Sequence, residues 1–225
     1  KILGSTSHIM ISDLSGNGIS DYQLFINKME KNEKVTEVTP VAYKTVLIRG
    51  PYKNSGVVLR GLDFKKQATL SFWEDKLDRG TLPDLKTDSG SILLGWDLSF
   101  EIGAGVGDLV TILSLSNRLT PTGLFPNIKK LRVTGIFRTG LYEYDASTAL
   151  VNLETAQNII GIDDRINLIQ MKIKNIFKAP EFKEEIRNML PPETYATTWI
   201  EMNESLFSAL KLEKKLMFFT IALII

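Results

Sequence analysis

Apolar and polar residues follow a strand, helix, hairpin order at the start of the chain. Residues 8–12 alternate like a β-strand, and a helix is predicted to begin after Asp21, whose side chain favours the N-cap position. A β-branched stretch over 35–48 and an apolar run over 57–62, separated by turn residues, then predict a hairpin. The apolar positions of the helix recur at helical spacing: Tyr22, Phe25, Ile26 and Met29.

The same order of elements returns late in the chain. Residues 168–174 alternate almost strictly, Pro180 stands where the first turn of a helix tolerates proline, and Pro191 ends that helix. Residues 194–199 are again typical of a strand. The apolar face of this second helix is Phe182, Ile186, Met189 and Leu190.

Between these units the pattern is mostly β. A helix is predicted over 72–77, and the elements after it are strands over 92–94, 109–115, 131–137 and 149–153 and a short helix over 154–160. We therefore expect an α+β protein. Residues 1–63 and 165–202 form a split two-layer α/β domain, and residues 64–164 form a β-rich domain inserted into it.

Residues 203–225 differ from the rest. Residues 203–215 predict an amphipathic helix, and from Leu216 onward the sequence is apolar and uncharged for about half of the roughly 20 residues that cross a bilayer. A buried terminal strand or core helix is the alternative. We favour a connecting helix that leads into the first half of a transmembrane helix, in a chain that is cut at both ends.

Composition narrows the possible chemistry. The 225 residues are 44% hydrophobic and 24% charged, which is typical of a globular protein. Lys and Arg total 27 against 26 for Asp and Glu, so no global field attracts nucleic acid and we expect no nucleic-acid partner. The absence of cysteine excludes disulfides and thiolate sites, and a single histidine, His8, argues against a catalytic triad or a histidine metal site.

Two motifs allow a chemical interpretation beside a structural one. The glycines of 103–107 could approach a phosphate, but their spacing fits neither dinucleotide nor nucleotide loops, and a tight turn before the next strand is the better interpretation. Glu143 and Asp145 would share one face of an extended segment and could serve acid–base chemistry or bind a cation. A polar loop anchored by the neighbouring tyrosines is the alternative, and we predict no catalytic, metal or cofactor site.

A short excursion between two predicted strands has the character of a docking arm. Its prolines and glycine stiffen the backbone, and two apolar residues stand at its tip, so that little order would be lost on binding a partner. A plain long hairpin is the alternative. The residues of this arm are Thr120, Pro121, Thr122, Gly123, Leu124, Phe125 and Pro126.

An ordered set of motifs across nearly the whole chain resembles the lipoprotein-releasing permeases, LolC and LolE. The motifs are Leu3-Gly4, His8-Ile9, Gly105-Val-Gly-Asp108, Thr120-Pro-x-Gly123 with Pro126 and Lys129, Val133-x-Gly-Ile-Phe137, Gly140-Leu-Tyr-Glu-Tyr-Asp145, Asn152-Leu-Glu-x-Ala-Gln157, Phe177-Lys-Ala-Pro180, Trp199 and Phe207-Ser-Ala-Leu-Lys-Leu-Glu-Lys214.

The resemblance implies a domain of the MacB-like core type in the periplasm of a diderm bacterium, between two transmembrane helices of an inner-membrane permease. Its split α/β part is called Porter and its inserted β-rich part Sabre. The implied partners are a LolD-like ATPase dimer, a second LolC/LolE-type permease, a lipoprotein substrate, the membrane and a soluble LolA-like carrier.

The resemblance also assigns roles to residues. The arm Thr120–Pro126 corresponds to the carrier-binding hook, and Lys129 to a basic position of the pad that supports the carrier. Three positions depart from the family. Thr122 stands where the family has the hook methionine, Ile128 where it has a polar pad residue, and Val110 where it has a further basic pad residue. The segment that couples the domain to the membrane includes Phe207, Leu210 and Lys214.

Two other functions stay open at this stage. The first is a MacB-like efflux permease, whose related domain engages other periplasmic partners. The second is an extracytoplasmic enzyme that uses Glu143 and Asp145, and it predicts a pocket in which both carboxylates converge.

Overall fold

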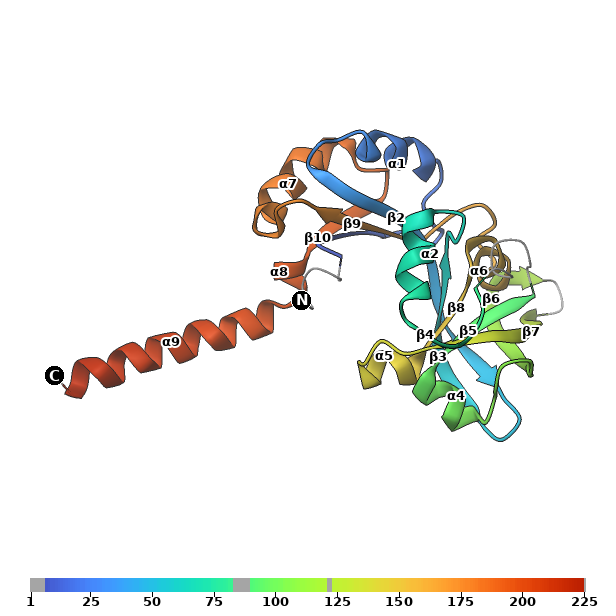
Figure 1. The fold of residues 1–225 in the computed structure, drawn as a ribbon. Coiled ribbons are helices and arrows are strands. Elements are labelled where there is room, and N and C mark those ends of the chain that lie inside the picture. The colour runs from blue at the N-terminus through green and yellow to red at the C-terminus, as the bar shows by residue number, and fades with distance from the viewer. Residues whose placement is uncertain (1–6, 83–89, 121–122, 225) are drawn as a thin grey trace.

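The computed structural model describes residues 7–82, 90–120 and 123–224 (Figure 1). Within them lie ten strands: β1 (Ile9–Asp13), β2 (Val35–Arg49), β3 (Asn54–Leu62), β4 (Leu77–Gly80), β5 (Ser91–Gly95), β6 (Leu109–Thr120), β7 (Gly123–Phe137), β8 (Thr148–Asn152), β9 (Leu168–Ile173) and β10 (Thr194–Thr198). The helices are α1 (Tyr22–Glu30), α2 (Gln67–Glu74), α4 (Trp96–Ile102), α5 (Tyr142–Ser147), α6 (Leu153–Ile160), α7 (Ala179–Ile186), α8 (Trp199–Met202) and α9 (Glu204–Ile224).

Six of the strands form a closed sheet, which we call the closed part. Each strand is hydrogen-bonded to two others, in the cyclic order β2, β3, β8, β5, β7, β6. Alternate residues point inward, so that Leu59, Ile112 and Val133 are fully buried in one apolar core. Residues of α4 and α6 complete that core, and the two helices pack near opposite ends of β3.

The other part, which we call the four-stranded part, has strand order β10-β1-β9-β2 with every neighbouring pair antiparallel. Helices α1 and α7 lie on the same side of this sheet (Figure 1), and their apolar faces close a second core. Strand β2 belongs to both parts: residues 35–41 pair with β9, and residues 41–49 pair with β3.

A third apolar cluster lies where the two parts meet. Helix α2 contributes Trp73, whose ring makes an edge contact with Phe137 of β7, with centroids 5.0 Å apart. Tyr144 of α5 stacks on the same indole at 6.4 Å. The cluster therefore ties α2 and α5 to both sheets.

The structure confirms the mixed α/β class and much of the predicted element order. All four residues predicted for the buried face of α1 are buried. Asp21 is the N-cap residue of α1 as predicted, but its backbone is left-handed, with φ of 52°, and its side chain makes no capping hydrogen bond. The helix predicted over 72–77 lies at Gln67–Glu74, and Met189 is 39% exposed because α7 ends at Ile186.

The proposed domain boundaries at residues 63/64 and 164/165 stay a prediction. Helix α9 continues the chain after α8 and projects away from both parts (Figure 1). Its side chains are mostly exposed, including the large apolar ones between Leu206 and Phe219 other than half-buried Phe207. Among residues 7–82, 90–120 and 123–224, no helix is both long and apolar enough to span a membrane.

Candidate partner-docking site

The predicted arm lies at the tip of the β6–β7 hairpin, which extends beyond the core of the closed part. The ladder runs from Leu109 opposite Arg132 to Thr120 opposite Gly123, with an irregularity between 115 and 119. Val110 and Leu131, at the base, are fully buried. The hairpin is therefore anchored at its base by the core.

Only a portion of the arm can be placed. Thr120 ends β6, and Gly123, Leu124, Phe125 and Pro126 begin β7. Pro121 and Thr122 lie outside the described residues, as do the side chains of residues 115–125. Partner binding by the arm stays a prediction.

The pad role of Lys129 stays a prediction, and the structure shows where the residue lies. Lys129 pairs with the fully buried Ile112, so it lies on the inward-facing row of β7 and is half-buried. Val110, which departs from a further basic pad position of the family, is fully buried. Lys130 and Arg132 are the exposed cations of β7, on its outward-facing row.

An apolar row crosses three strands on the outer face beside these cations. Leu47 of β2 pairs with Leu113 of β6, which pairs with Ile128 of β7. Leu47 is 41% and Ile128 58% exposed, while Leu113 is half-buried between them. Sequence analysis missed Leu47 and Leu113. Their signal was an apolar residue at an outward position of each strand, but only the long-range register shows that the two are adjacent.

The two carboxylates of residues 142–145 do not form a catalytic pair. This segment is helix α5 rather than extended, and residues two apart on a helix do not share a face. Asp145 is buried and accepts hydrogen bonds from the backbone N–H groups of Thr139 and Gly140 at 3.0–3.1 Å, whereas Glu143 is exposed. The pocket in which both carboxylates converge is therefore a wrong prediction.

The remaining chemical candidates have structural roles. Gly103 and Gly107 have φ of 69° and 96°, and the Asp108 carboxylate accepts from the N–H of Gly105 at 2.8 Å, which confirms a tight turn. His8 is buried, and its Nδ1 accepts the N–H of Ile173 at 3.0 Å. Within the described ranges, no group of three or more acidic or histidine side chains could hold a metal ion.

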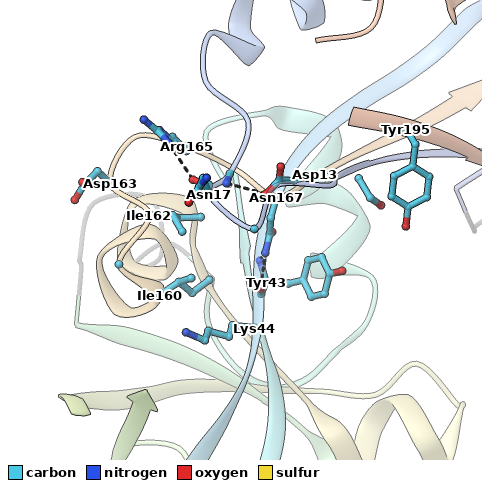
Figure 2. A pocket seen from close by; sticks show the side chains of 14 residues that line it. Asp13, Asn17, Tyr43, Lys44, Ile160, Ile162, Asp163, Arg165, Asn167 and Tyr195 are labelled. Carbon is cyan, nitrogen blue, oxygen red and sulfur yellow. Dashed lines mark hydrogen bonds between the residues drawn. The ribbon is translucent and has the colours of Figure 1, made fainter. Parts of the chain in front are cut away.

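A polar cleft of about 530 Å³ lies where the two parts meet (Figure 2). The Asn167 amide accepts from the Tyr43 N–H at 2.9 Å and donates to the Tyr43 carbonyl at 2.6 Å, so that it continues the β9–β2 pairing through a side chain. Arg165 donates to the Asn17 carbonyl at 3.2 Å. Burial acts to raise the pKa of Asp13, but hydrogen bonds from Ser15 and Gly18 outweigh it and hold the pKa below its ordinary value. These polar groups join segments of the fold to one another.

The predicted coupling segment is attached through one aromatic contact. Phe207 of α9 packs against Trp199, with ring centroids 5.4 Å apart, and the Trp199 Nε1 donates to the Ile176 carbonyl at 2.8 Å. Leu210 and Lys214, farther along α9, are exposed. Of the three predicted coupling residues, Phe207 therefore contacts the four-stranded part.

Helix α8, which precedes α9, is also held in place by an ion pair. Thr198 and Glu201 form a capping box at the start of α8, and Glu201 pairs with Lys183 of α7 at 2.7 Å. Burial acts to raise the pKa of Glu201, but the hydrogen bonds from Lys183 and Thr198 together hold it below its ordinary value.

The chain is similar over its whole length to proteins named lipoprotein-releasing system transmembrane protein LolC. It is 28% identical over 225 residues to that of Xylella fastidiosa (strain Temecula1) and 28% identical over 230 residues to that of Neisseria meningitidis serogroup B. Each match covers 100% of this chain and 54% of the relative. The lipoprotein-releasing system transmembrane protein LolE of Haemophilus influenzae is 22% identical over 208 residues, which cover 92% of this chain and 50% of LolE.

These relatives confirm the resemblance that the motifs indicated, and the chain spans about half the length of the curated relatives it matches. No protein-family model matches the chain.

Solved structures show the fold. The periplasmic region of MacB from Actinobacillus actinomycetemcomitans superposes with a TM-score of 0.57 at 15% identity, covering 90% of this chain and 93% of that one. The extracellular domain of the noncanonic ABC-type transporter YknZ from Gram-positive bacteria gives a TM-score of 0.55 at 12% identity, covering 86% and 100%. The chain therefore has the fold of these extracytoplasmic transporter domains.

Proposed function

We propose that the chain is the periplasmic domain of an inner-membrane ABC transporter permease that extracts lipoproteins from the membrane and passes them to a LolA-like carrier. The observation that carries this proposal is the similarity to LolC over all 225 residues, because it includes the hairpin arm and the connecting helix as well as the core. In this proposal residues 1–63 and 165–202 form the Porter-like part and residues 64–164 the Sabre-like part.

In this proposal a LolD-like ATPase dimer hydrolyses ATP, and a second LolC/LolE-type permease completes the transporter. In this chain the N–H of Gly105, in the glycine turn, donates to the Asp108 carboxylate, as in a tight turn. Helix α9 links the membrane to the four-stranded part through Phe207 and Trp199. Movement of the membrane helices would therefore reach the domain at the edge where β10 and α8 meet.

The test is carrier capture. The double variant Leu124→Ser with Phe125→Ser removes the apolar tip of the arm and should reduce capture of the LolA-like carrier by the full-length permease about tenfold or more, because each buried apolar side chain contributes about 1.5–3 kcal/mol. The measurement is a pull-down with the carrier of the same organism. The matched control is Leu24→Ser, which removes a 75% exposed leucine from α1 and should leave capture unchanged.

Unchanged capture by the arm variant would contradict the hook assignment. A MacB-like efflux permease is the second candidate, because the MacB periplasmic region has the same fold. It predicts that even the unmodified permease captures no carrier.

A further inference from the structure

The closed part and the four-stranded part are joined by β2, whose strand neighbours change along its length. Residues 35–41 pair with β9 and residues 47–49 with β6, whereas residues 42–46 pair with β3 alone among the described strands. Two-stranded ribbons take up larger twists than wider sheets. The stretch 42–46 is therefore the place in the sheet where one part can turn relative to the other.

Two hydrogen bonds from one side chain hold the start of this stretch. Asn167 directly precedes β9, and its Oδ1 accepts from the Tyr43 N–H at 2.9 Å while its Nδ2 donates to the Tyr43 carbonyl at 2.6 Å (Figure 2). We call this pair of bonds the Asn167 clasp. A carboxamide can make both bonds, whereas a carboxylate accepts but does not donate. Because both bonds are exposed, the clasp can open by exchanging them for bonds to water.

The polar cleft of about 530 Å³ separates the two parts beside the clasp. Ser12 and Tyr195 line it from the four-stranded part, and Lys44 and Ile160 line it from the closed part. A packed interior leaves no such space between its elements. The cleft therefore gives the two parts room to move toward or away from one another.

A different side of the same junction is tightly packed. The third apolar cluster holds Leu168 of β9 and Leu150 of β8, one from each part, together with Trp73 of α2. It shares no residue with the lining of the cleft. A rotation that keeps these contacts must pivot on the α2 side, so that its largest displacement falls on the cleft side.

The clasp residue itself belongs to the four-stranded part. The connection that carries Asn167 is bonded to the β1–α1 loop, because Ile19 donates to the Ile166 carbonyl at 2.6 Å and Arg165 donates to the Asn17 carbonyl at 3.2 Å. Tyr43 lies on the stretch of β2 that pairs with β3. The clasp therefore ties one part to the other across the cleft.

We infer that the closed part turns relative to the four-stranded part about the α2 side, and that the Asn167 clasp holds them in the orientation of this structure. Opening the clasp would free β2 to twist at 42–46 and change the width of the cleft. Movement that enters at α9 would reach the β6–β7 hairpin in full only while the clasp is closed. This role of the clasp goes beyond the proposed function and does not depend on a carrier.

The experiment measures distances between the two parts in the full-length permease, purified in detergent and freed of any cysteine outside this cysteine-free chain. Leu24→Cys on α1 and Tyr52→Cys in the β2–β3 turn carry spin labels, since these positions are 75% and 87% exposed. Pulsed electron paramagnetic resonance should give one narrow distance distribution. Asn167→Ala, or Asn167→Asp, which keeps the shape but loses the donor, should raise the population of other distances about tenfold, because both or one of two hydrogen bonds are lost.

A matched variant removes a similar side-chain bond inside the closed part. Asn127 of β7 donates to the Asn158 carbonyl of α6 at 2.8 Å, and Asn127→Ala should leave the distribution between the labels at 24 and 52 unchanged. A second label pair, Tyr52→Cys with Tyr142→Cys, lies wholly within the closed part and should give the same distribution in every variant.

Two outcomes would overturn the role of the clasp. One is that both Asn167 variants give the distribution of the unmodified protein for the labels at 24 and 52. The other is that the pair at 52 and 142 also broadens, because the closed part itself would then have loosened. Failure of the unmodified permease to capture a carrier would contradict the proposed function and leave these distances unaffected, so the two proposals fail separately.

Discussion

The four-stranded part and the closed part each bury one face of a sheet, but they do so in different ways. In the former, helices α1 and α7 cover the apolar face, and the remaining edge is used to attach α8 and α9. In the latter, the sheet buries its own inner face, and α2 covers part of its outer face, while Leu47 and Ile128 on the outer face of β2 and β7 stay exposed. The comparison teaches that the attachment of α9 and the long β6–β7 hairpin are built on different sheets that share β2.

The largest expected effect tests whether the two parts are energetically separate. Leu59→Ala removes a fully buried side chain from the core of the closed part and should lower the free energy of unfolding by about 2–5 kcal/mol. Because β2 is continuous through both sheets, we expect both parts to unfold together. Urea unfolding can follow Trp199 in the four-stranded part and Trp73 at the junction in single-tryptophan variants.

Coincident shifts of both transitions would show one cooperative unit. A shift confined to Trp73 would contradict that expectation and sharpen the distinction between the parts.

A smaller effect tests how the closed part is sealed at one end. A Cβ at Gly61 of β3 would collide with the Cβ of Ala156 on α6, so Gly61→Ala should displace α6 and cost about 1–3 kcal/mol. The matched control is Gly56→Ala on the same strand, where a Cβ meets no atom within 4 Å and the change should stay within about 0.5 kcal/mol. Thermal melting of both variants provides the comparison, and equal losses would mean that α6 does not close this end tightly.

The smallest effect concerns the attachment of α9 and depends on pH. The folded-state pKa of Glu201 is lowered, so its contribution to stability is present above its ordinary pKa of 4.5 and is lost as pH falls through the folded value. Because its side chain is 47% exposed, we expect less than about 1 kcal/mol at pH 7. Glu201→Gln keeps the capping geometry without the charge.

Melting temperatures of the two proteins should therefore differ near neutral pH and converge below about pH 4. Exposed Glu143, replaced by Gln, is the control and should show no such convergence. A difference that persists at low pH would place the effect in packing rather than in charge.

The local pattern of apolar and polar residues predicted the helices and strands better than the contacts between them. The face of α1 was predictable because its apolar spacing matches the helical period that its packing requires. The helix at residues 142–145 was not predictable from the alternation of residue types. Its Asp145 carboxylate accepts hydrogen bonds from the backbone of residues 139–140, which the local pattern does not reveal. Helix α4 was missed because its seven residues are too few to show a period.

The candidate docking site was likewise predicted only where its signal lies in a short stretch of sequence. The arm could be recognised from its prolines and its resemblance, since both are local. The inward direction of Lys129 and the adjacency of Leu47 to Leu113 depend on the pairing of whole strands, and β2 and β6 are more than 60 residues apart in the chain. Such registers are set by the closure of the whole sheet.

The shared strand β2 also determines the order in which the chain can be assembled. Every strand of the closed part lies between residues 35 and 152, so its contacts can form as soon as that stretch has been synthesised. The four-stranded part must wait, because β1 pairs only with β9 and β10, more than 150 residues later in the chain. Non-local pairing of this kind forms slowly, and domains fold as units during synthesis. The closed part can therefore be finished first and act as the template, through β2, on which the four-stranded part that carries α9 is completed.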